Sequence, residues 1–225
     1  KWPGGKTQVL PRLREVVARL GGLKPHQTYH ESFVGVGALF HDLEPAKARL
    51  NDASPALVNC LHALQADPDT VHVELQALVG AFPPHDDRPR QESYYNAVRA
   101  TFNGYLPLIG TMMAAPPALV AAQMIFLNRT CFNGLWRVSQ KGKYNASLGR
   151  YKAPAFPSLE ALRAIGGRLR PAIITLGDYS TALMDAKEGD LAFLDPPYGG
   201  VRGDAGFTGY TAEGFSAGQQ RWLVE

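Results

Sequence analysis

Segments with β-strand character lie near both ends of this chain, and a long helical stretch separates them. Residues that favour strands dominate four short runs, at 28–33, 48–50, 172–176 and 191–194. Between residues 55 and 128 the pattern is helical almost throughout, with breaks at Pro68, at 83–90 and at Pro116-Pro117. This order predicts an α/β fold in which a core of parallel strands is interrupted by a mainly helical insertion.

Two further segments complete this outline. Apolar residues at helical spacing over residues 9–20 stop at Gly21-Gly22, which predicts an amphipathic helix with a glycine stop. A turn-rich basic segment, residues 129–152, follows the helical stretch and contains a candidate β-hairpin at 138–144.

Composition places the chain among soluble globular proteins, with 45% hydrophobic and 19% charged residues. The longest apolar run, residues 118–127, is interrupted by Gln123 and is far shorter than the roughly 20 residues of a membrane span. Cys60 and Cys131 lie far apart and form no CxxC pair, so we expect a reducing, cytoplasmic setting. Because the chain starts at Lys1 and ends in a helix-like stretch, we expect both ends to be incomplete.

Positive charge is concentrated in one part of the sequence. The window 131–170 carries a net charge of +7, which leaves −4 for the rest because the whole chain is +3. Such a window fits a surface that contacts a polyanion such as nucleic acid. An ordinary solvated charged face is the alternative.

A glycine turn follows the first predicted strand, at Phe33-Val34-Gly35-Val36-Gly37. Glycines at this position let the backbone turn tightly into a helix and let its amides approach a ligand. The third glycine of the dinucleotide fingerprint is replaced by Phe40, which disfavours NAD. Asp52 ends the second strand, where it can bind ribose hydroxyls or cap the next helix. An ordinary strand-to-helix turn remains the alternative for the glycines.

The tetrapeptide Asp195-Pro196-Pro197-Tyr198 follows the last predicted strand. Two prolines fix the backbone and remove two donors, so a carboxylate and free carbonyls face one point beside an aromatic ring. This acceptor-rich point suits a planar amine that stacks on Tyr198. A chance proline-rich turn is the alternative.

Taken together, these motifs resemble the Dam-type DNA adenine-N6 methyltransferases, which form the alpha group of the D12 class. The resemblance covers essentially the whole chain, and it rests on motifs in the family's order: residues 1–6, 33–37, 51–52, 132–137, 149–152 and 195–198. It implies a Rossmann-like, S-adenosylmethionine-dependent methyltransferase core with a mainly helical target-recognition insertion that carries the hairpin. The implied domains are residues 1–55 and 153–225 for the core and 56–152 for the insertion.

The resemblance also implies site residues. Those expected to bind the cofactor are Trp2, Lys6, Phe33, Gly35, Gly37, Asp52, Asp178, Tyr179 and Asp195. Asp195, Pro196, Pro197 and Tyr198 are expected to hold the target adenine and to be catalytic. The residues expected to contact DNA are Phe132, Asn133, Leu135, Arg137, Arg150, Tyr151 and Lys152.

The implied activity is transfer of methyl from S-adenosylmethionine to a flipped-out adenine in a short duplex sequence, GATC or a GATC-like palindrome. S-adenosylhomocysteine is the other product, and no metal ion is expected. Double-stranded DNA is the expected partner, with no membrane association, and we expect a monomer from a bacterium or a phage. Two alternatives stay open, namely methylation of RNA or of a protein amide, and a DNA-binding relative without catalysis.

Overall fold

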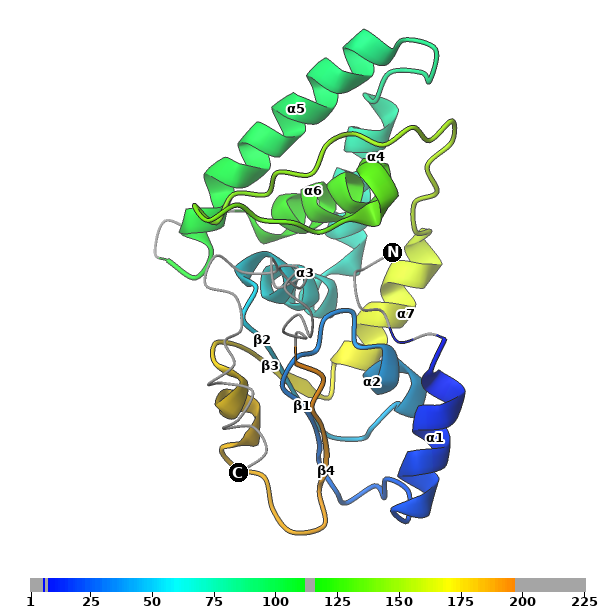
Figure 1. Cartoon of the computed structure of the whole chain (residues 1–225), viewed down its shortest axis with the longest axis vertical. Coiled ribbons are helices and arrows are strands. Elements are labelled where there is room, and N and C mark those ends of the chain that lie inside the picture. The colour runs from blue at the N-terminus through cyan, green and yellow to red at the C-terminus, as the bar shows by residue number, and fades with distance from the viewer. Residues whose placement is uncertain (1–5, 7, 112–115, 197–225) are drawn as a thin grey trace, which may run out of the picture.

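The computed structural model describes residue 6 and residues 8–111 and 116–196 (Figure 1). Within these residues, four parallel strands form one sheet in the order β3-β2-β1-β4. The strands are β1 (Tyr29–Glu31), β2 (Ala48–Asp52), β3 (Ala172–Leu176) and β4 (Leu191–Phe193). All four predicted strands are confirmed, and so is the α/β fold class with its parallel sheet.

Helices fill the predicted helical stretch, and proline marks where they begin. The helices are α1 (Leu10–Arg19), α2 (Ala38–Leu43), α3 (Pro55–Ala66), α4 (Pro68–Gly80), α5 (Arg88–Tyr105), α6 (Pro117–Thr130) and α7 (Leu159–Leu169). The described residues also form short 3₁₀ helices, η1 (Leu106–Leu108), η2 (Phe132–Gly134) and η3 (Tyr179–Leu183). Proline is tolerated in the first turn because the amide there has no helical partner. No described helix combines the length and the apolar character needed to cross a membrane.

The N-termini of α3, α4 and α5 are capped by side chains. Ser54, Asp67 and Asp87 each accept a hydrogen bond from a backbone amide three residues further on. Such caps satisfy donors that the first helical turn leaves unpaired. Cap and proline together therefore explain why the predicted helical stretch divides at these points.

The two faces of the sheet have different neighbours. Tyr29, Leu50 and Ile174 are buried on one face, against which α2 and α3 pack. Alternate residues on the other face include His30 and Arg49, which contact η3 and the loop that follows it. In the described residues, the sheet thus lies between α2 and α3 on one face and η3 with the loop after it on the other.

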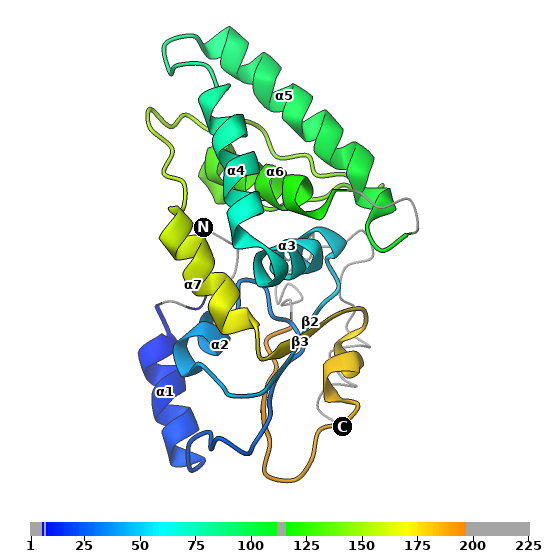
Figure 2. The same cartoon turned by 180° about the vertical axis from the view of Figure 1, so that it is seen from behind.

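Most of the helical stretch lies on the side of α3 that faces away from the sheet, whereas α1 packs against α2. Both views place α4, α5 and α6 there, while α7 runs beside α3 toward the sheet (Figures 1 and 2). α3 packs against α6 as well as against β3 and α7, and one apolar core continues through it. The domain boundaries at residues 55 and 152 stay a prediction.

The candidate hairpin has little regular strand structure. Val138 and Tyr144 form an isolated antiparallel bridge, and Ser139 N–H donates to the Lys143 carbonyl at 2.8 Å. A second isolated bridge joins Cys131 to Leu148. In the described part of the chain, no longer strand forms between residues 131 and 149. Residues 131–149 thus pair with one another only at isolated bridges and single hydrogen bonds. Many of their other backbone groups bond to side chains of α5, as described below.

Candidate functional site at the carboxyl ends of the strands

Parallel strands place their carboxyl ends at one edge of the sheet. β2 and β3 follow β1 on one side of the sheet, whereas β4 lies on the other side of β1. The order in which strands are added therefore reverses between β1 and β4. In open α/β sheets, ligands bind in the crevice beyond the carboxyl ends at such a switch point. Glu31 ends β1, Asp52 ends β2, and Asp195 follows β4 by two residues. The structure therefore gathers three acidic residues around the expected binding point.

The glycine turn between β1 and α2 follows the predicted tight path. Gly35 has φ 51° and Gly37 has φ 62°, in the left-handed region where a side chain is disfavoured. Gly37 is also the N-cap residue of α2, and its amide donates to the Val34 carbonyl at 2.6 Å. The two glycines thus let the backbone reverse immediately at the end of β1.

Asp52 fixes this turn from the neighbouring strand. Its Oδ2 accepts from Gly35 N–H at 3.0 Å, and its Oδ1 accepts from Ser54 N–H at 2.9 Å. Burial raises the pKa of Asp52, and these backbone hydrogen bonds oppose the rise. Ser54, not Asp52, caps α3. Each carboxylate oxygen can accept a second hydrogen bond, so the bracing of the turn leaves acceptor capacity for a ligand hydroxyl.

Lys6 and Asp195 form an ion pair beside the turn. Lys6 Nζ lies 2.5 Å from Asp195 Oδ2, and both side chains are about one-fifth exposed, at 21% and 19%. The structure therefore brings together two residues from opposite ends of the predicted site. A carboxylate held in this way has a fixed position just beyond the carboxyl end of β4.

Glu31 is a site residue that the sequence analysis missed. It is buried at the end of β1, and Tyr29 Oη donates to its Oε2 at 2.9 Å. Burial raises its pKa to about 8, and the negative charges of Asp195 and Asp52 contribute. Its position immediately before the glycine turn was the available signal, because a carboxylate there faces the same crevice.

Phe33 and Tyr179 form one aromatic wall of the site. Their rings stack with centroids 5.7 Å apart and an interplanar angle of 20°. Asp178 lies next to them and caps η3, because its side chain accepts from Ser180 N–H at 3.0 Å. The predicted positions 33 and 179 are thus in contact, although Phe33 lies in the turn after β1 and Tyr179 begins η3 after β3.

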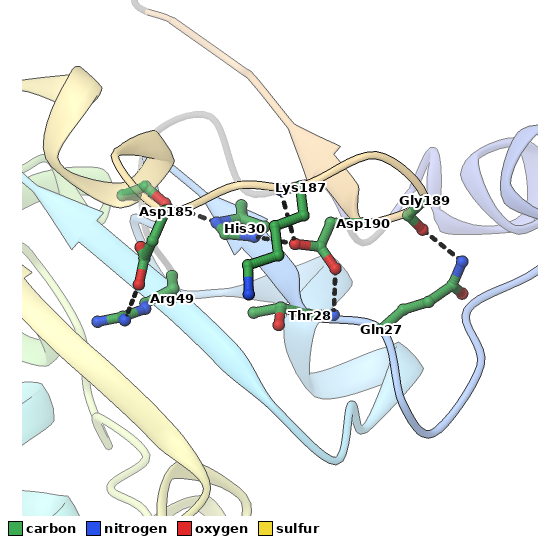
Figure 3. Close-up of polar contacts among 9 residues, drawn as sticks. Gln27, Thr28, His30, Arg49, Asp185, Lys187, Gly189 and Asp190 are labelled. Atoms are coloured by element: carbon green, nitrogen blue, oxygen red, sulfur yellow. Dashed lines mark hydrogen bonds and ion pairs between the residues drawn. The ribbon is translucent and has the colours of Figure 1, made fainter.

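A polar network beneath the sheet holds η3 in place (Figure 3). His30 Nδ1 lies 2.6 Å from the Ala182 carbonyl, and its Nε2 lies 3.2 Å from Asp190 Oδ2. Asp190 also accepts from the Thr28 and Lys187 amides, and these bonds lower its pKa. Arg49 forms an ion pair with Asp185 in the same region. This network was not predictable from the sequence, since a polar residue inside a short strand gives no sign of its partners.

The predicted DNA-contacting residues lie in the segment after α6, away from the strand ends (Figure 1). Phe132 is 52% exposed, and Asn133 adopts φ 54°, unusual for a residue with a side chain. Arg137 is exposed and bonds to Asn145, and Leu135 is half-buried. The predicted DNA contacts fall into two groups, residues 132–137 and residues 150–152. All three residues of the second group are exposed, namely Arg150, Tyr151 and Lys152. Pairing of residues 130–132 with 147–149 brings the two groups onto neighbouring stretches of backbone.

Some predicted site residues cannot be placed. Three of them lie outside the described residues, namely Trp2, Pro197 and Tyr198, and so does the helix-like stretch at the end of the chain, residues 216–224. Pro196 is described and partly exposed. Among residues 6, 8–111 and 116–196, no group of three or more His, Cys, Asp or Glu side chains is arranged to hold a metal ion.

The fold and the site define a class of protein. A parallel sheet with a glycine turn after β1 and acidic residues at the neighbouring strand ends is typical of Rossmann-like α/β proteins that bind a nucleoside-containing ligand. The family model described as D12 class N6 adenine-specific DNA methyltransferase matches residues 2–225. The chain therefore belongs to this family, as its motif order predicts.

Curated relatives carry names from the same family. The chain is 32% identical over 218 residues to the Type II methyltransferase M1.LlaDCHI of Lactococcus lactis subsp. cremoris, covering 96% of this chain and 70% of that protein. It is 34% identical over 224 residues to the DNA N-6-adenine-methyltransferase of Escherichia phage P1, covering 27% of that protein. Identity to the DNA adenine methylase of Vibrio cholerae serotype O1 is 28% over 232 residues, or 73% of its length.

Proposed function

We propose that this chain transfers a methyl group from S-adenosylmethionine to N6 of adenine in a short sequence of duplex DNA. The observation that carries the proposal is the Lys6–Asp195 ion pair at the edge of the sheet where Asp52 also braces the glycine turn. Family membership supplies the reaction class, and this edge supplies groups of the kind that the reaction needs.

The residues at the strand ends fit the proposed cofactor. S-adenosylmethionine carries a positively charged sulfonium and an ammonium group, which suit a site with three nearby carboxyl groups. Lys6 can bind its carboxylate, Asp52 its ribose hydroxyls, and the Phe33–Tyr179 wall its adenine ring. Ser32 Oγ, next to the turn, is buried without a hydrogen-bond partner among the described residues, so a polar ligand atom can be accommodated there.

The proposed roles of Asp195 and Pro196 follow from the chemistry of the amine. The lone pair of adenine N6 is delocalised into the ring, so the nitrogen is a poor nucleophile. When bound, the cofactor supplies an electrophilic methyl group. Asp195 and the Pro196 carbonyl accept the two N6 hydrogens, which favours a pyramidal nitrogen and points its lone pair at that methyl group. The proton that N6 loses then passes to Asp195 or to water.

The proposed DNA contacts extend the site to the segment after α6. N6 of a paired adenine cannot reach the strand ends, so the proposal includes extrusion of the base from the duplex. Arg137 is proposed to read a guanine, with Leu135 beside a neighbouring base, and Lys152 is proposed to bind a phosphate. The target we propose is GATC or a GATC-like palindrome.

One assay tests the proposal and its alternatives. Purified protein is incubated with S-adenosylmethionine labelled in the methyl group and with duplex DNA, RNA or protein in parallel. We expect label in duplex DNA as N6-methyladenine, and sequencing of modified DNA from a host without adenine methylation should identify one short motif. Label only in RNA or in protein would replace the proposed substrate. Cofactor and DNA binding without transfer would indicate an inactive relative.

A further inference from the structure

Residues 144–149 lie between two partners, in the manner of an inner strand. The amides of Asn145 and Gly149 donate to the carbonyls of Arg137 and Thr130 at 3.1 and 2.8 Å. The carbonyl of Ser147 accepts from Phe132 N–H at 2.8 Å. The odd-numbered residues of this segment therefore pair with the backbone of residues 130–137.

The other edge of the segment is bound by side chains of α5. The donors are Arg88, Tyr95, Arg99 and Asn103, spaced seven, four and four residues apart on one face of the helix. Arg88 donates to the Gly149 and Leu148 carbonyls at 2.5 and 3.2 Å, and Tyr95 and Arg99 donate to the Ala146 carbonyl at 3.0 and 2.9 Å. These contacts replace the neighbouring strand that the segment lacks on this edge.

Asn103 makes the most complete of these contacts. Its Nδ2 donates to the Tyr144 carbonyl at 3.0 Å, and its Oδ1 accepts from Tyr144 N–H at 2.8 Å. A single side chain thus satisfies both backbone groups of Tyr144, whose side chain is only 1% exposed. Buried backbone groups are costly to leave unpaired, so this contact fixes the depth and register of the segment.

The same segment holds the side chain of Arg137. Arg137 Nε donates to Asn145 Oδ1 at 2.8 Å, and Nη2 lies 3.4 Å from the Asn145 carbonyl. The position of Asn145 therefore determines where the exposed guanidinium points. Since α5 fixes the residues on both sides of Asn145, a continuous chain of hydrogen bonds connects α5 to Arg137.

We propose that Arg88, Tyr95, Arg99 and Asn103 on α5 are positioning residues that set the sequence specificity of methylation by holding residues 144–149, and through Asn145 the guanidinium of Arg137, in one orientation. This inference rests on the proposed function. A guanidinium that reads guanine with two hydrogen bonds needs a fixed direction, and discrimination by such a pair requires both bonds.

The test compares Asn103→Leu with Asn96→Leu, a matched change at an exposed position of α5. Neither substitution alters charge, so phosphate attraction stays constant. The readout is kcat/KM on the cognate duplex, identified by sequencing, and on its single-base variants. We expect Asn103→Leu to lower discrimination at one base pair by about tenfold or more, with KM for the cofactor unchanged. Asn96→Leu should retain the wild-type ratio.

A second pair of variants covers the case in which Asn103→Leu does not fold. Arg99→Met should also lower discrimination, and Arg99→Lys, which keeps a donor for the Ala146 carbonyl, should restore it. Arg90→Met, which removes an exposed charge from the same helix, is the control for charge. Loss of rate by one factor on all duplexes, with unchanged discrimination, would overturn the inference. If the wild-type protein methylates no duplex, the proposed function fails, and this inference fails with it.

Discussion

At the scale of single residues, the ion pair between Lys6 and Asp195 has the clearest functional consequence. The two atoms lie 2.5 Å apart although the residues are at opposite ends of the described chain. An ammonium group at this distance attracts the Asp195 carboxylate and restricts its position. The pair therefore holds Asp195 where the proposed amine acceptor is needed.

Substitution of Asp195 should separate catalysis from cofactor binding. Asp195→Asn removes one acceptor for N6 but leaves the glycine turn, Asp52 and the Phe33–Tyr179 wall intact. We expect turnover to fall by about 100-fold or more, the usual cost of losing a transition-state contact, while cofactor binding by calorimetry stays measurable. Asp69→Asn, at an exposed ion pair on α4, is the matched control. Retention of more than about a tenth of the activity would contradict the proposed role.

Glu31 should make stability depend on pH in a defined range. Its pKa is about 8 in the folded protein and ordinarily 4.5, so the folded state holds a proton that the unfolded chain has released between these values. The free energy of unfolding should therefore fall as pH rises from about 4.5 to about 8, by on the order of a few kcal/mol. Glu31→Gln should flatten this slope in urea titrations, whereas Glu15→Gln on the exposed face of α1 should not. An unchanged slope in Glu31→Gln would argue against a protonated Glu31.

At the scale of elements, two adjacent glycines of α7 have opposite surroundings. A Cβ on Gly166 would lie 2.3 Å from the Leu64 carbonyl oxygen of α3, whereas one on Gly167 would have no heavy atom within 4 Å. Gly166 thus permits the close contact between α7 and α3, and Gly167 contributes no such contact. The contact matters because α3 joins the sheet to the helices on its other side.

Alanine substitutions should therefore change stability in opposite directions. Gly166→Ala forces the two helices apart and should cost about 1–3 kcal/mol of unfolding free energy. Gly167→Ala removes helix-destabilising flexibility and should add about 0.5–1 kcal/mol. Equilibrium unfolding in urea measures both. Equal effects of the two substitutions would mean that α7 and α3 can separate without cost.

The sequence predicted elements well where local signals determine them. The strand at 172–176 coincides with β3, and the breaks at Pro68 and Pro116-Pro117 coincide with the starts of α4 and α6. α7 was not predicted, although Ser158 caps it, because its two adjacent glycines weaken the helical pattern. The candidate hairpin at 138–144 pairs with itself at one isolated bridge, between Val138 and Tyr144. The bonds from α5 to residues 144–149 were not predicted, because side-chain to backbone bonds between distant segments leave no periodic pattern in a sequence.

The parts of the site that a local sequence motif marks were predictable from the sequence. The glycine turn and Asp52 were found because strand, turn and helix follow one another locally. Glu31 was not found because the two acidic residues that lie near it, Asp52 and Asp195, follow other strands. The network around His30 was not found because its partners lie in η3 and in the loop before β4. Which residues lie side by side across a sheet depends on the order of the strands, and the spacing of residues along the sequence does not reveal that order.

At the scale of the whole molecule, the basic segment and the strand ends occupy different parts of the structure (Figures 1 and 2). The proposed cofactor contacts come from loops at the edge of the sheet, whereas Arg137 and Lys152 belong to the segment beside α5 and α6. Substitutions in the segment should therefore change DNA recognition without changing cofactor affinity. The two basic residues should do so in different ways.

Arg137→Ala and Lys152→Ala should separate base reading from phosphate binding. Arg137 is held by Asn145 and can donate two hydrogen bonds to a guanine, so its loss should cost about 1–3 kcal/mol on the cognate duplex and relax preference at one base pair. Lys152 is exposed and carries a flexible ammonium, which suits a phosphate. Its loss should weaken all duplexes alike and reduce the salt dependence of binding by about one unit of slope. Methylation of the cognate duplex and its single-base variants at two salt concentrations measures both effects. If Arg137→Ala lowers methylation of every duplex by the same factor, the Asn145 contact is structural and Arg137 does not read a base.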